Sequence, residues 1–485
     1  MPSLSMEKLS ENIIATKYQV RGAVYLAATE RQRQGKEVIF TSVGNPHQLG
    51  QVPLTFLRQV LALVTAPFLM DDPKTANAFP ADAIRRAREY LSNITSVGAY
   101  TDSRGSSLVR EQVAKFLHDR DGIPAHIDLI FLTDGASAAV RLGLQMLIRG
   151  TGFRDGILVP IPQYPLYSAS IALLGGILIP YELDEEADWG LNMQAIQNAV
   201  DQARADYICP RALVFINPGN PTGQQLTESQ LAGMIQICHT EQLALLADEV
   251  YQENVYGDAR PFISARSVLG RIGGKVAEET QLLTFHTVSK GSLGECGLRG
   301  GFVELKNIPE DVVGEMYKLA SINLSPNVPG QIAMGVLVNP PQRGDESYTQ
   351  WEAERSAVID SLARRAAAIT KALNSLPGVR CAAAGSLYAF PQITLPPGAI
   401  TAAQSKGVAP DVFYCLELLN ETGIATTPGS GFGQKDGTFH FRTTILPPEE
   451  KIKQFGDSIK KFHMGFIAKY SGQASGASAQ PTSRL

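Results

Sequence analysis

Thr284-Phe285-His286-Thr287-Val288-Ser289-Lys290-Gly291 is an apolar and β-branched stretch that runs into a lysine. Leu282 and Leu283 precede it, so the run predicts a buried strand. Lysine is among the residues that proteins bury least readily without a partner. Lys290 at the end of a core strand therefore needs a chemical or structural explanation.

Four further apolar runs of similar length precede this strand in the chain. Segments with helical spacing lie between them, such as 228–241, whose apolar positions are Leu231, Met234, Ile235 and Cys238. Apolar strands that alternate with helices predict a largely parallel sheet covered by helices on both faces. The five predicted strands are 129–133, 156–161, 212–216, 244–247 and 282–287.

The alternation of strands and helices stops near residue 340. A charged helical stretch follows at 352–376, and then 386–390 and 438–442 alternate in polarity as half-exposed strands do. We therefore predict an α/β protein with a large domain, built on a mainly parallel central sheet, and a smaller α+β C-terminal domain. The predicted parts are an N-terminal arm and linker (1–55), the large domain (56–340), the small domain (341–470) and a tail (471–485).

Composition excludes several function classes. The chain has 485 residues with 43 basic and 47 acidic side chains, a net charge of −4, which does not favour a nucleic-acid or acidic-membrane partner. No apolar run approaches the ~20 residues that a membrane-spanning helix needs. The five cysteines are scattered without a CxxC spacing, which indicates reduced thiols rather than a metal site. They are Cys209, Cys238, Cys296, Cys381 and Cys415.

The last fifteen residues, 471–485, read SGQASGASAQPTSRL. Small and polar residues dominate, so the segment cannot bury a core and we predict a disordered tail. It ends in Ser483-Arg484-Leu485, a conservative variant of the Ser-Lys-Leu address that the peroxisomal import receptor reads. We therefore expect this receptor as a partner and the peroxisome as the location. A chance ending on a cytoplasmic protein is the alternative.

Chemistry-bearing residues follow the predicted strands. In open parallel sheets, ligands bind beyond the carboxyl ends of the strands. Asp134-Gly135-Ala136-Ser137 follows the first strand and opens a helix, and the free backbone N–H groups at a helix start suit a phosphate. The residues that follow the later strands are Tyr164, Asn220, Asp248, Tyr251 and Lys290.

Each of these residues also has a plain structural interpretation. Tyr164 and Tyr251 could belong to the core, Asn220 could form a turn, and Asp248 could cap a helix. An aromatic ring, an amide, a carboxylate, a phenol and a lysine at consecutive strand ends are harder to explain in that way. We therefore predict a ligand site along this edge of the sheet.

Eight motifs together point to one family. They are 45–51 (NPHQLGQ), 100–105 (YTDSRG), 134–137 (DGAS), 217–223 (NPGNPTG), 248–251 (DEVY), Ser289-Lys290, 428–433 (PGSGFG) and Phe441-Arg442. With them, the chain resembles the fold-type-I, class I pyridoxal-phosphate aminotransferases over nearly its whole length, and within these the alanine aminotransferase subgroup. The resemblance implies the fold of those transferases and pyridoxal 5'-phosphate as the cofactor.

The resemblance explains the lysine at the end of the strand. Lys290 would form a Schiff base with the cofactor aldehyde, and burial favours its uncharged amine because desolvation disfavours the ammonium. Once the amino acid substrate frees it, this amine would shuttle the proton at the substrate Cα. Asp248 would pair with the pyridine nitrogen, and Tyr164 would stack on the ring. Asn220 and Tyr251 would hydrogen-bond the ring hydroxyl.

The resemblance also implies a carboxylate site and a phosphate site. Arg442 would clamp the substrate carboxylate with two parallel hydrogen bonds, and Gly44 and Asn220 would line the same place. Tyr100 would reach the phosphate from the partner subunit, which requires a homodimer. Arg299 lies one position later than the phosphate-binding basic residue of many relatives, in a longer loop that resembles the alanine subgroup. The phosphate ligands within the chain would be Ala136, Ser137, Thr287, Ser289 and Arg299.

The resemblance therefore implies an aminotransferase that moves an amino group between a small L-amino acid and a 2-oxo acid. Alanine and glutamate are the expected donors, and 2-oxoglutarate, pyruvate and glyoxylate are the expected acceptors. A peroxisomal location adds glutamate:glyoxylate transfer and photorespiration, because plant-like peroxisomal members of the subgroup catalyse that reaction. Two alternatives stay open: a lyase of the aminocyclopropane carboxylate synthase type, which needs no 2-oxo acid acceptor, and a cofactor-binding regulatory protein on the same fold.

Overall fold

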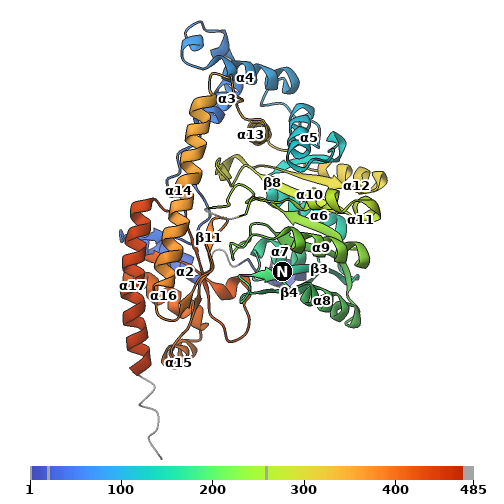
Figure 1. The fold of residues 1–485 in the computed structure, drawn as a ribbon. Helices are drawn as coiled ribbons and strands as arrows, with labels where there is room; N and C mark the ends of the chain where they lie inside the picture. The colour runs from blue at the N-terminus through green and yellow to red at the C-terminus, as the bar shows by residue number, and fades with distance from the viewer. Residues whose placement is uncertain (1–2, 19–21, 257–259, 473–485) are drawn as a thin grey trace, which may run out of the picture.

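The computed structural model describes residues 3–18, 22–256 and 260–472. Figure 1 shows a part rich in strands and a C-terminal part in which the long helices α14 (Tyr348–Asn374) and α17 (Glu449–Ser471) run side by side. The helix predicted at 352–376 is α14. Of the predicted tail, only 471 and 472 belong to the described residues, so the terminal Ser483-Arg484-Leu485 lies outside them.

The predicted parallel sheet is present and has eight strands in the order β2-β9-β8-β7-β6-β3-β4-β5. The neighbouring strands from β8 across to β4 pair in parallel, whereas β9 is antiparallel to β2 and β8, and β5 is antiparallel to β4. The five strands predicted from the sequence are confirmed, and β4, β5 and β9 are additional. The bounds are β2 (Ile130–Asp134), β3 (Asp155–Ile161), β4 (Ile177–Asp184), β5 (Gly190–Leu191), β6 (Cys209–Ile216), β7 (Ala244–Asp248), β8 (Leu282–Thr287) and β9 (Gly300–Lys306).

Both faces of this sheet are buried, as the alternation of strands and helices predicts. Along β6, Val214 and Ile216 belong to one core cluster while Leu213 and Phe215 belong to another. Caps fix where helices begin; Thr227, for example, forms a capping box at the start of the predicted helix 228–241. The helices of this part are α3 (Thr55–Thr65), α4 (Ala81–Ile94), α5 (Ser107–Asp121), α6 (Ala136–Leu147), α7 (Pro165–Leu173), α8 (Met193–Ala205), α9 (Glu228–Glu241), α10 (Ala265–Ile272), α11 (Gly274–Glu279), α12 (Glu310–Ser321) and α13 (Val328–Val338).

The C-terminal part contains small separate sheets, one formed by three strands and another by two. β11 (Tyr388–Ala389) and β14 (Thr427–Pro428) flank β15 (Phe441–Thr444), and β10 (Val379–Arg380) pairs with β12 (Gln392–Ile393). Strands at 386–390 and 438–442 are confirmed in part by β11 and β15, but the predicted half-exposed pattern was wrong, because both strands are buried throughout. Among the polar residues of β15, the side chains of Arg442 and Thr444 hydrogen-bond inside the molecule, whereas Oγ1 of Thr443 is buried without a partner among the described residues. The helices here are α14, α15 (Pro397–Ser405), α16 (Pro410–Thr422) and α17.

The N-terminal segment joins this C-terminal part. It contains α1 (Glu11–Ala15), α2 (Ala23–Arg33) and β1 (Ile39–Phe40), and β1 pairs in parallel with β13 (Ile424–Ala425). Just after β1, the N–H of Thr41 donates to the carbonyl of Ala425, and the N–H of Thr444 donates to the carbonyl of Thr41. These bonds bring the residues that follow Thr41 alongside β15.

The strand that ends near Lys290 is a core strand, as predicted. All six residues of β8 are buried. His286 lies between the rings of Phe116 and Phe302, and burial lowers the pKa of its imidazole to about 3. This histidine is therefore neutral and packs as a core residue.

Three further features bear on function class. No helix among the described residues is long and apolar enough to cross a membrane. Within the same residues, no group of three or more histidine, cysteine, aspartate or glutamate side chains could hold a metal ion. The five cysteines are all free thiols.

Candidate active site

A cavity of about 370 Å³ lies at the carboxyl ends of β3, β6, β7 and β8. This is the edge of the sheet along which the sequence predicts a ligand site. Every predicted site residue except Tyr100 lines it: Gly44, Ala136, Ser137, Tyr164, Asn220, Asp248, Tyr251, Thr287, Ser289, Lys290, Arg299 and Arg442.

Lys290 enters the cavity from the turn after β8. Its Nζ donates to the carbonyl oxygen of Gly44 at 2.9 Å. The next residue, Gly291, has φ +65°, and a Cβ there would collide with the carboxylate of Glu253, so the turn requires glycine. The N–H of Gly291 donates to Asn254 Oδ1 at 3.0 Å. The backbone thus fixes the direction in which Lys290 leaves the strand.

Asp248 is a buried carboxylate at the end of β7. The hydroxyl of Tyr167 donates to its Oδ2 at 2.8 Å, while its Oδ1 is buried and has no hydrogen-bond partner among the described residues. Burial raises the pKa of Asp248 to about 6. A protonated ring nitrogen in the cavity would give the carboxylate a charged partner, so this position fits a pyridine-type cofactor.

Arg442 is held with its guanidinium already oriented. Its Nη1 donates to Asn220 Oδ1 at 3.1 Å, and its Nη2 donates to the carbonyl of Ser42 at 2.9 Å. Its Cζ lies 4.2 Å from the ring centroid of Tyr388 and 4.7 Å from that of Phe432, so two aromatic rings contact the group. Its Nε is buried without a partner among the described residues. A small carboxylate is the ligand that this group would bind best.

Asn220 connects this arginine to a tyrosine pair. Its Nδ2 lies 3.3 Å from the hydroxyl of Tyr251, which in turn hydrogen-bonds the hydroxyl of Tyr388. Burial raises the pKa of Tyr251 well above its ordinary value. Burial acts in the same direction on Tyr388, but the charges of Lys290 and Arg442 and the bond from Tyr251 outweigh it, so the pKa of Tyr388 is lowered. These phenols can donate to an oxygen on a bound ring.

The start of α6 forms a small cradle opposite Arg442. Gly135 has φ +80°, and a Cβ on it would lie 2.5 Å from Nη2 of Arg299. A Cβ on Gly301 would lie 2.8 Å from the backbone nitrogen of Ala136. Gly301 therefore keeps side-chain atoms away from the N–H that opens the helix, and Gly135 leaves room for the guanidinium of Arg299. Free N–H groups beside an arginine suit a phosphate.

The hydroxyls of this cradle are pre-arranged. Thr287 Oγ1 lies 3.1 Å from Ser289 Oγ and 2.7 Å from the carbonyl of Gly300. Arg299 donates to the carbonyls of Asp134 and Cys296 at 3.1 and 3.0 Å. Together with the unpartnered Oδ1 of Asp248, the cradle fits a ring that carries a phosphate.

Tyr164 and Tyr100 take different positions. Tyr164 lines the cavity at the start of α7, and its hydroxyl lies 3.4 Å from that of Tyr18. Tyr100 is 77% exposed and lies outside the cavity of its own chain. Its assignment to the partner subunit's phosphate stays a prediction.

The cavity also contains residues that the sequence reading missed. Tyr388, Ser42 and Cys296 line it together with the predicted set. None of these three residues directly follows a predicted strand, so the sequence carried no signal that they line the site. Tyr388, for example, reaches the cavity through the pairing of β11 with β15. The Sγ of Cys296 lies 3.2 Å from the carbonyl of Ser289.

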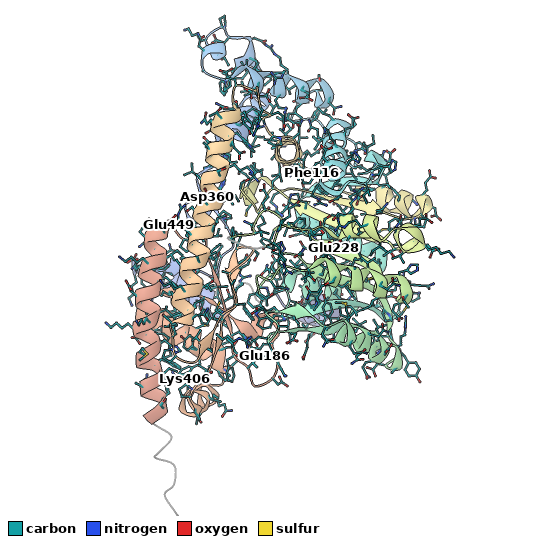
Figure 2. All side chains as sticks on the ribbon, viewed as in Figure 1. Phe116, Glu186, Glu228, Asp360, Lys406 and Glu449 are labelled. Carbon is teal, nitrogen blue, oxygen red and sulfur yellow. The ribbon has the colours of Figure 1, made fainter. Side chains whose placement is uncertain are left out.

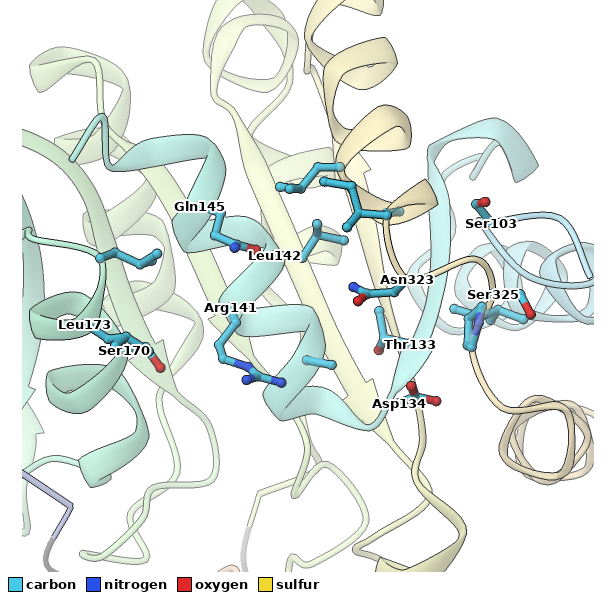
Figure 3. Close-up of a pocket in the computed structure, with 17 residues that line it drawn as sticks. Ser103, Thr133, Asp134, Arg141, Leu142, Gln145, Ser170, Leu173, Asn323 and Ser325 are labelled. Atoms are coloured by element: carbon cyan, nitrogen blue, oxygen red, sulfur yellow. The ribbon is translucent and has the colours of Figure 1, made fainter. Parts of the chain in front are cut away.

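A second cavity, of about 400 Å³, lies on the other side of α6 and contains none of the predicted site residues (Figure 3). Arg141 and Gln145 project from α6, and Asn323 and Ser325 come from the segment between α12 and α13. Asp134, on its wall, accepts hydrogen bonds from the N–H and the Nδ2 of Asn327, at 2.8 Å each. The residues predicted to bind cofactor and substrate therefore line the first cavity and not this one.

Comparisons with known proteins agree with this geometry. The model of the family "Aminotransferase class I and II" matches residues 70–459. Glutamate–glyoxylate aminotransferase 1 of Arabidopsis thaliana is 55% identical over 473 residues, which cover 97% of this chain and 98% of that protein. Alanine aminotransferase 2 of Panicum miliaceum is 46% identical and covers 96% and 99%. The alanine aminotransferase structure of Pyrococcus furiosus has a TM-score of 0.75 at 24% identity, over 94% of this chain and all of that one, which shows the shared fold.

Proposed function

The chain belongs to the class I and II aminotransferases, and we propose that within this family it transfers the amino group of glutamate to glyoxylate. It is an enzyme that moves amino groups between amino acids and 2-oxo acids with pyridoxal 5'-phosphate as cofactor. The observation that carries the choice of substrates is the higher identity with glutamate–glyoxylate aminotransferases than with alanine aminotransferases, over nearly the whole chain. The relatives named above are aminotransferases, which supports this activity over the lyase and the regulatory alternatives.

The cofactor supplies an electron sink that lets the bond between the substrate Cα and its proton break. Lys290 would be its covalent attachment point, since its amine enters the cavity from a rigid turn. Asp248 would hold the pyridine nitrogen protonated, because a carboxylate buried against that nitrogen stabilises the positive charge. Tyr164 would pack against the ring, and Asn220 and Tyr251 would hydrogen-bond its hydroxyl.

The phosphate would bind at the start of α6. The N–H of Ala136, the hydroxyls of Ser137, Thr287 and Ser289, and the guanidinium of Arg299 surround that place. The positive end of the helix dipole adds to their attraction for an anion. Anchored there, the cofactor would keep one orientation relative to Lys290 through both half-reactions.

Arg442 would hold the α-carboxylate that every substrate of the enzyme shares. Its contacts with Asn220 and with the carbonyl of Ser42 leave a planar fork oriented before the substrate arrives. When the amino acid is bound, the freed amine of Lys290 would lie beside the substrate Cα. It would take the Cα proton and pass it to the cofactor. Gly44, whose carbonyl accepts a hydrogen bond from Nζ of Lys290, would steer that amine.

Assembly and location are parts of the same proposal. A homodimer would place Tyr100 at the partner subunit's phosphate, which fits the exposure of this tyrosine in the single chain. The division into an N-terminal arm, a large and a small domain would let the C-terminal part carry Arg442 toward the cofactor. Peroxisomal import through Ser483-Arg484-Leu485 would bring the enzyme to glyoxylate, whereas some alanine aminotransferase relatives are named mitochondrial.

Two experiments test the substrates and the location. Purified holoenzyme would be offered glutamate or alanine with glyoxylate, 2-oxoglutarate or pyruvate, and the products identified by mass spectrometry. Glycine and 2-oxoglutarate formed from glutamate and glyoxylate support the proposal. Turnover of alanine with 2-oxoglutarate and none with glyoxylate would favour the alanine aminotransferase activity instead. For the location, an N-terminally tagged chain should leave peroxisomes when its last three residues are deleted.

A further inference from the structure

Outside the cavity, a buried histidine lies two residues before Arg442 and has no role in the proposal above. His440 is 1% exposed. Its Nδ1 lies 3.0 Å from Oε1 of Gln434, and its Nε2 lies 2.9 Å from Oε1 of Glu185. Its ring stacks on Phe390 with 4.9 Å between centroids. Polar partners at both nitrogens and a stacked ring leave His440 a single position.

Glu185 comes from the sheet and not from the C-terminal part. It lies in the turn between β4 and β5, next to Glu186, which Figure 2 labels where the two parts of the molecule meet. Gln392 donates to Oε2 of Glu185 at 3.2 Å, and Arg380 donates to the backbone carbonyl of Glu185 and to Oε2 of Glu186 at 3.1 and 2.7 Å. The side chain of Glu185 is 19% exposed, whereas that of Glu186 is 82% exposed. C-terminal side chains therefore hold this turn, and His440 binds the partly buried carboxylate of Glu185.

Aromatic contacts connect His440 to the substrate arginine. Phe390, which stacks on His440, meets Phe432 edge-to-face at 5.8 Å, and Phe432 contacts the guanidinium of Arg442. The carbonyl of Phe432 accepts a hydrogen bond of 2.7 Å from the N–H of Gln163, the residue before Tyr164. Phe432 thus lies between the arginine and the loop that carries the ring-stacking tyrosine.

The turn that carries Phe432 is itself fixed on His440. The N–H of Gly429 donates to the carbonyl of His440 at 2.8 Å, and a Cβ on Gly429 would lie 2.5 Å from Oε1 of Gln434. The same Oε1 accepts the backbone N–H of His440 at 3.1 Å. The glycine-rich motif 428–433 is therefore hydrogen-bonded to the backbone of His440, and the Phe432 that it carries contacts Arg442.

We propose that Glu185 and His440 are positioning residues for substrate binding, which hold Phe432 against Arg442 from across the boundary between the sheet and the C-terminal part. This rests on the proposed role of Arg442 as the carboxylate clamp. A bidentate pair loses affinity when the fork is free to turn, because both hydrogen bonds need one orientation. Loosening the pair should therefore weaken binding of every substrate carboxylate by a similar factor and leave the proton transfer at Lys290 in place.

The variant Glu185→Gln tests this, because it keeps the size of a partly exposed side chain and removes its charge. We expect KM for glutamate and KM for glyoxylate to rise together by roughly three- to tenfold, with kcat within about twofold of the wild type. The dissociation constant of glutarate, an unreactive dicarboxylate, should rise by a similar factor in calorimetry on the holoenzyme. The matched control Glu186→Gln loses an exposed ion pair and should change these constants by less than about twofold.

Two further variants distinguish an error in the positioning proposal from an error in the role assigned to Arg442. His440→Asn should give the same paired rise in KM; a fall in kcat and in Tm with KM unchanged would mean a purely structural role and overturn the proposal. Arg442→Lys serves as the reference for the clamp. If Arg442→Lys leaves KM unchanged, the assigned role of Arg442 fails. If Arg442→Lys raises KM but Glu185→Gln changes neither KM nor the glutarate constant, the positioning proposal alone is wrong.

Discussion

At the scale of single residues, Asp248 shows how a site can weaken the protein that carries it. Its carboxylate is fully buried, and one of its oxygens has no partner among the described residues. Its pKa in the folded chain, about 6, lies above the ordinary value of 3.8 because burial disfavours the charge. The folded state therefore binds this proton more tightly than the unfolded state. Stability is lost as the pH rises from about 4 to 6 and does not return at higher pH.

Asp248→Asn should therefore stabilise the cofactor-free protein at pH 8. The gain is about 3 kcal/mol, since each pKa unit corresponds to about 1.4 kcal/mol. Near pH 2 the gain should vanish, because that pH lies well below both pKa values, the ordinary 3.8 and the folded value of about 6, and the carboxyl group is then protonated in both states. Urea unfolding of both apoproteins at the two pH values measures the difference. In the holoenzyme the same variant should lose most of its activity, and equal stability of the two apoproteins at pH 8 would contradict the account.

Lys290→Ala should abolish transamination without unfolding the chain. The amine is the proposed acid–base group at the substrate Cα, and such groups contribute about 10²–10⁴-fold to the rate. The fold should survive because Nζ donates a single hydrogen bond among the described residues, to Gly44, and the turn is held by Gly291, Asn254 and Glu253. Product assays and a thermal melt measure the two effects. Wild-type turnover in this variant would remove Lys290 from the mechanism.

At the scale of elements, the sequence predicted the strands whose cores are apolar and missed those with mixed patterns. β4 contains Pro180 and alternates between buried and exposed residues, and a proline within a run argues against a strand. β9 begins with Gly300 and Gly301, which weaken any strand signal. Both are nevertheless strands because paired neighbours complete the sheet on either side.

Site residues that directly follow a predicted strand could be predicted from the sequence. Those that reach the cavity because strand pairing brings distant segments together could not. The pattern of strands supplied the residues at the ends of β3, β6, β7 and β8, and the resemblance supplied their expected roles. Tyr388 and Ser42 reach the cavity only because β11 pairs with β15 and Thr41 pairs with both β13 and β15. Glu185 meets His440 across the boundary between the two parts of the molecule, which no local pattern reveals.

The packing of the N-terminal segment against β11 leads to a prediction at Gly44. A Cβ on Gly44 would overlap the hydroxyl of Tyr388. The ring of Tyr388 in turn stacks on the guanidinium of Arg442. Gly44→Ala should therefore displace the segment or the ring and raise KM for all carboxylate substrates by about tenfold or more. The double variant Gly44→Ala with Tyr388→Phe removes the colliding oxygen and should recover part of the loss. No recovery, or no effect of the single variant, would contradict the steric explanation.

At the scale of the whole molecule, the proposed dimer predicts that two defective chains can complement each other. A Tyr100→Ala chain and a Lys290→Ala chain should each form impaired homodimers. Hybrid dimers would contain one intact site, built from Lys290 of the first chain and Tyr100 of the second. A random equal mixture, unfolded and refolded together, should recover about a quarter of wild-type activity, because half of the dimers are hybrids with one of two sites intact. Recovery to no more than the sum of the homodimers would place Tyr100 in its own chain's site or outside any site.

A steady-state comparison of acceptors, with glutamate as the donor, tests the proposed glutamate:glyoxylate activity most directly. The purified full-length holoenzyme would be assayed with glyoxylate and, separately, with pyruvate, by following glycine, alanine and 2-oxoglutarate. We expect kcat/KM for glyoxylate to exceed that for pyruvate, with one 2-oxoglutarate formed for each glycine. A holoenzyme that aminates pyruvate and leaves glyoxylate untouched would contradict it.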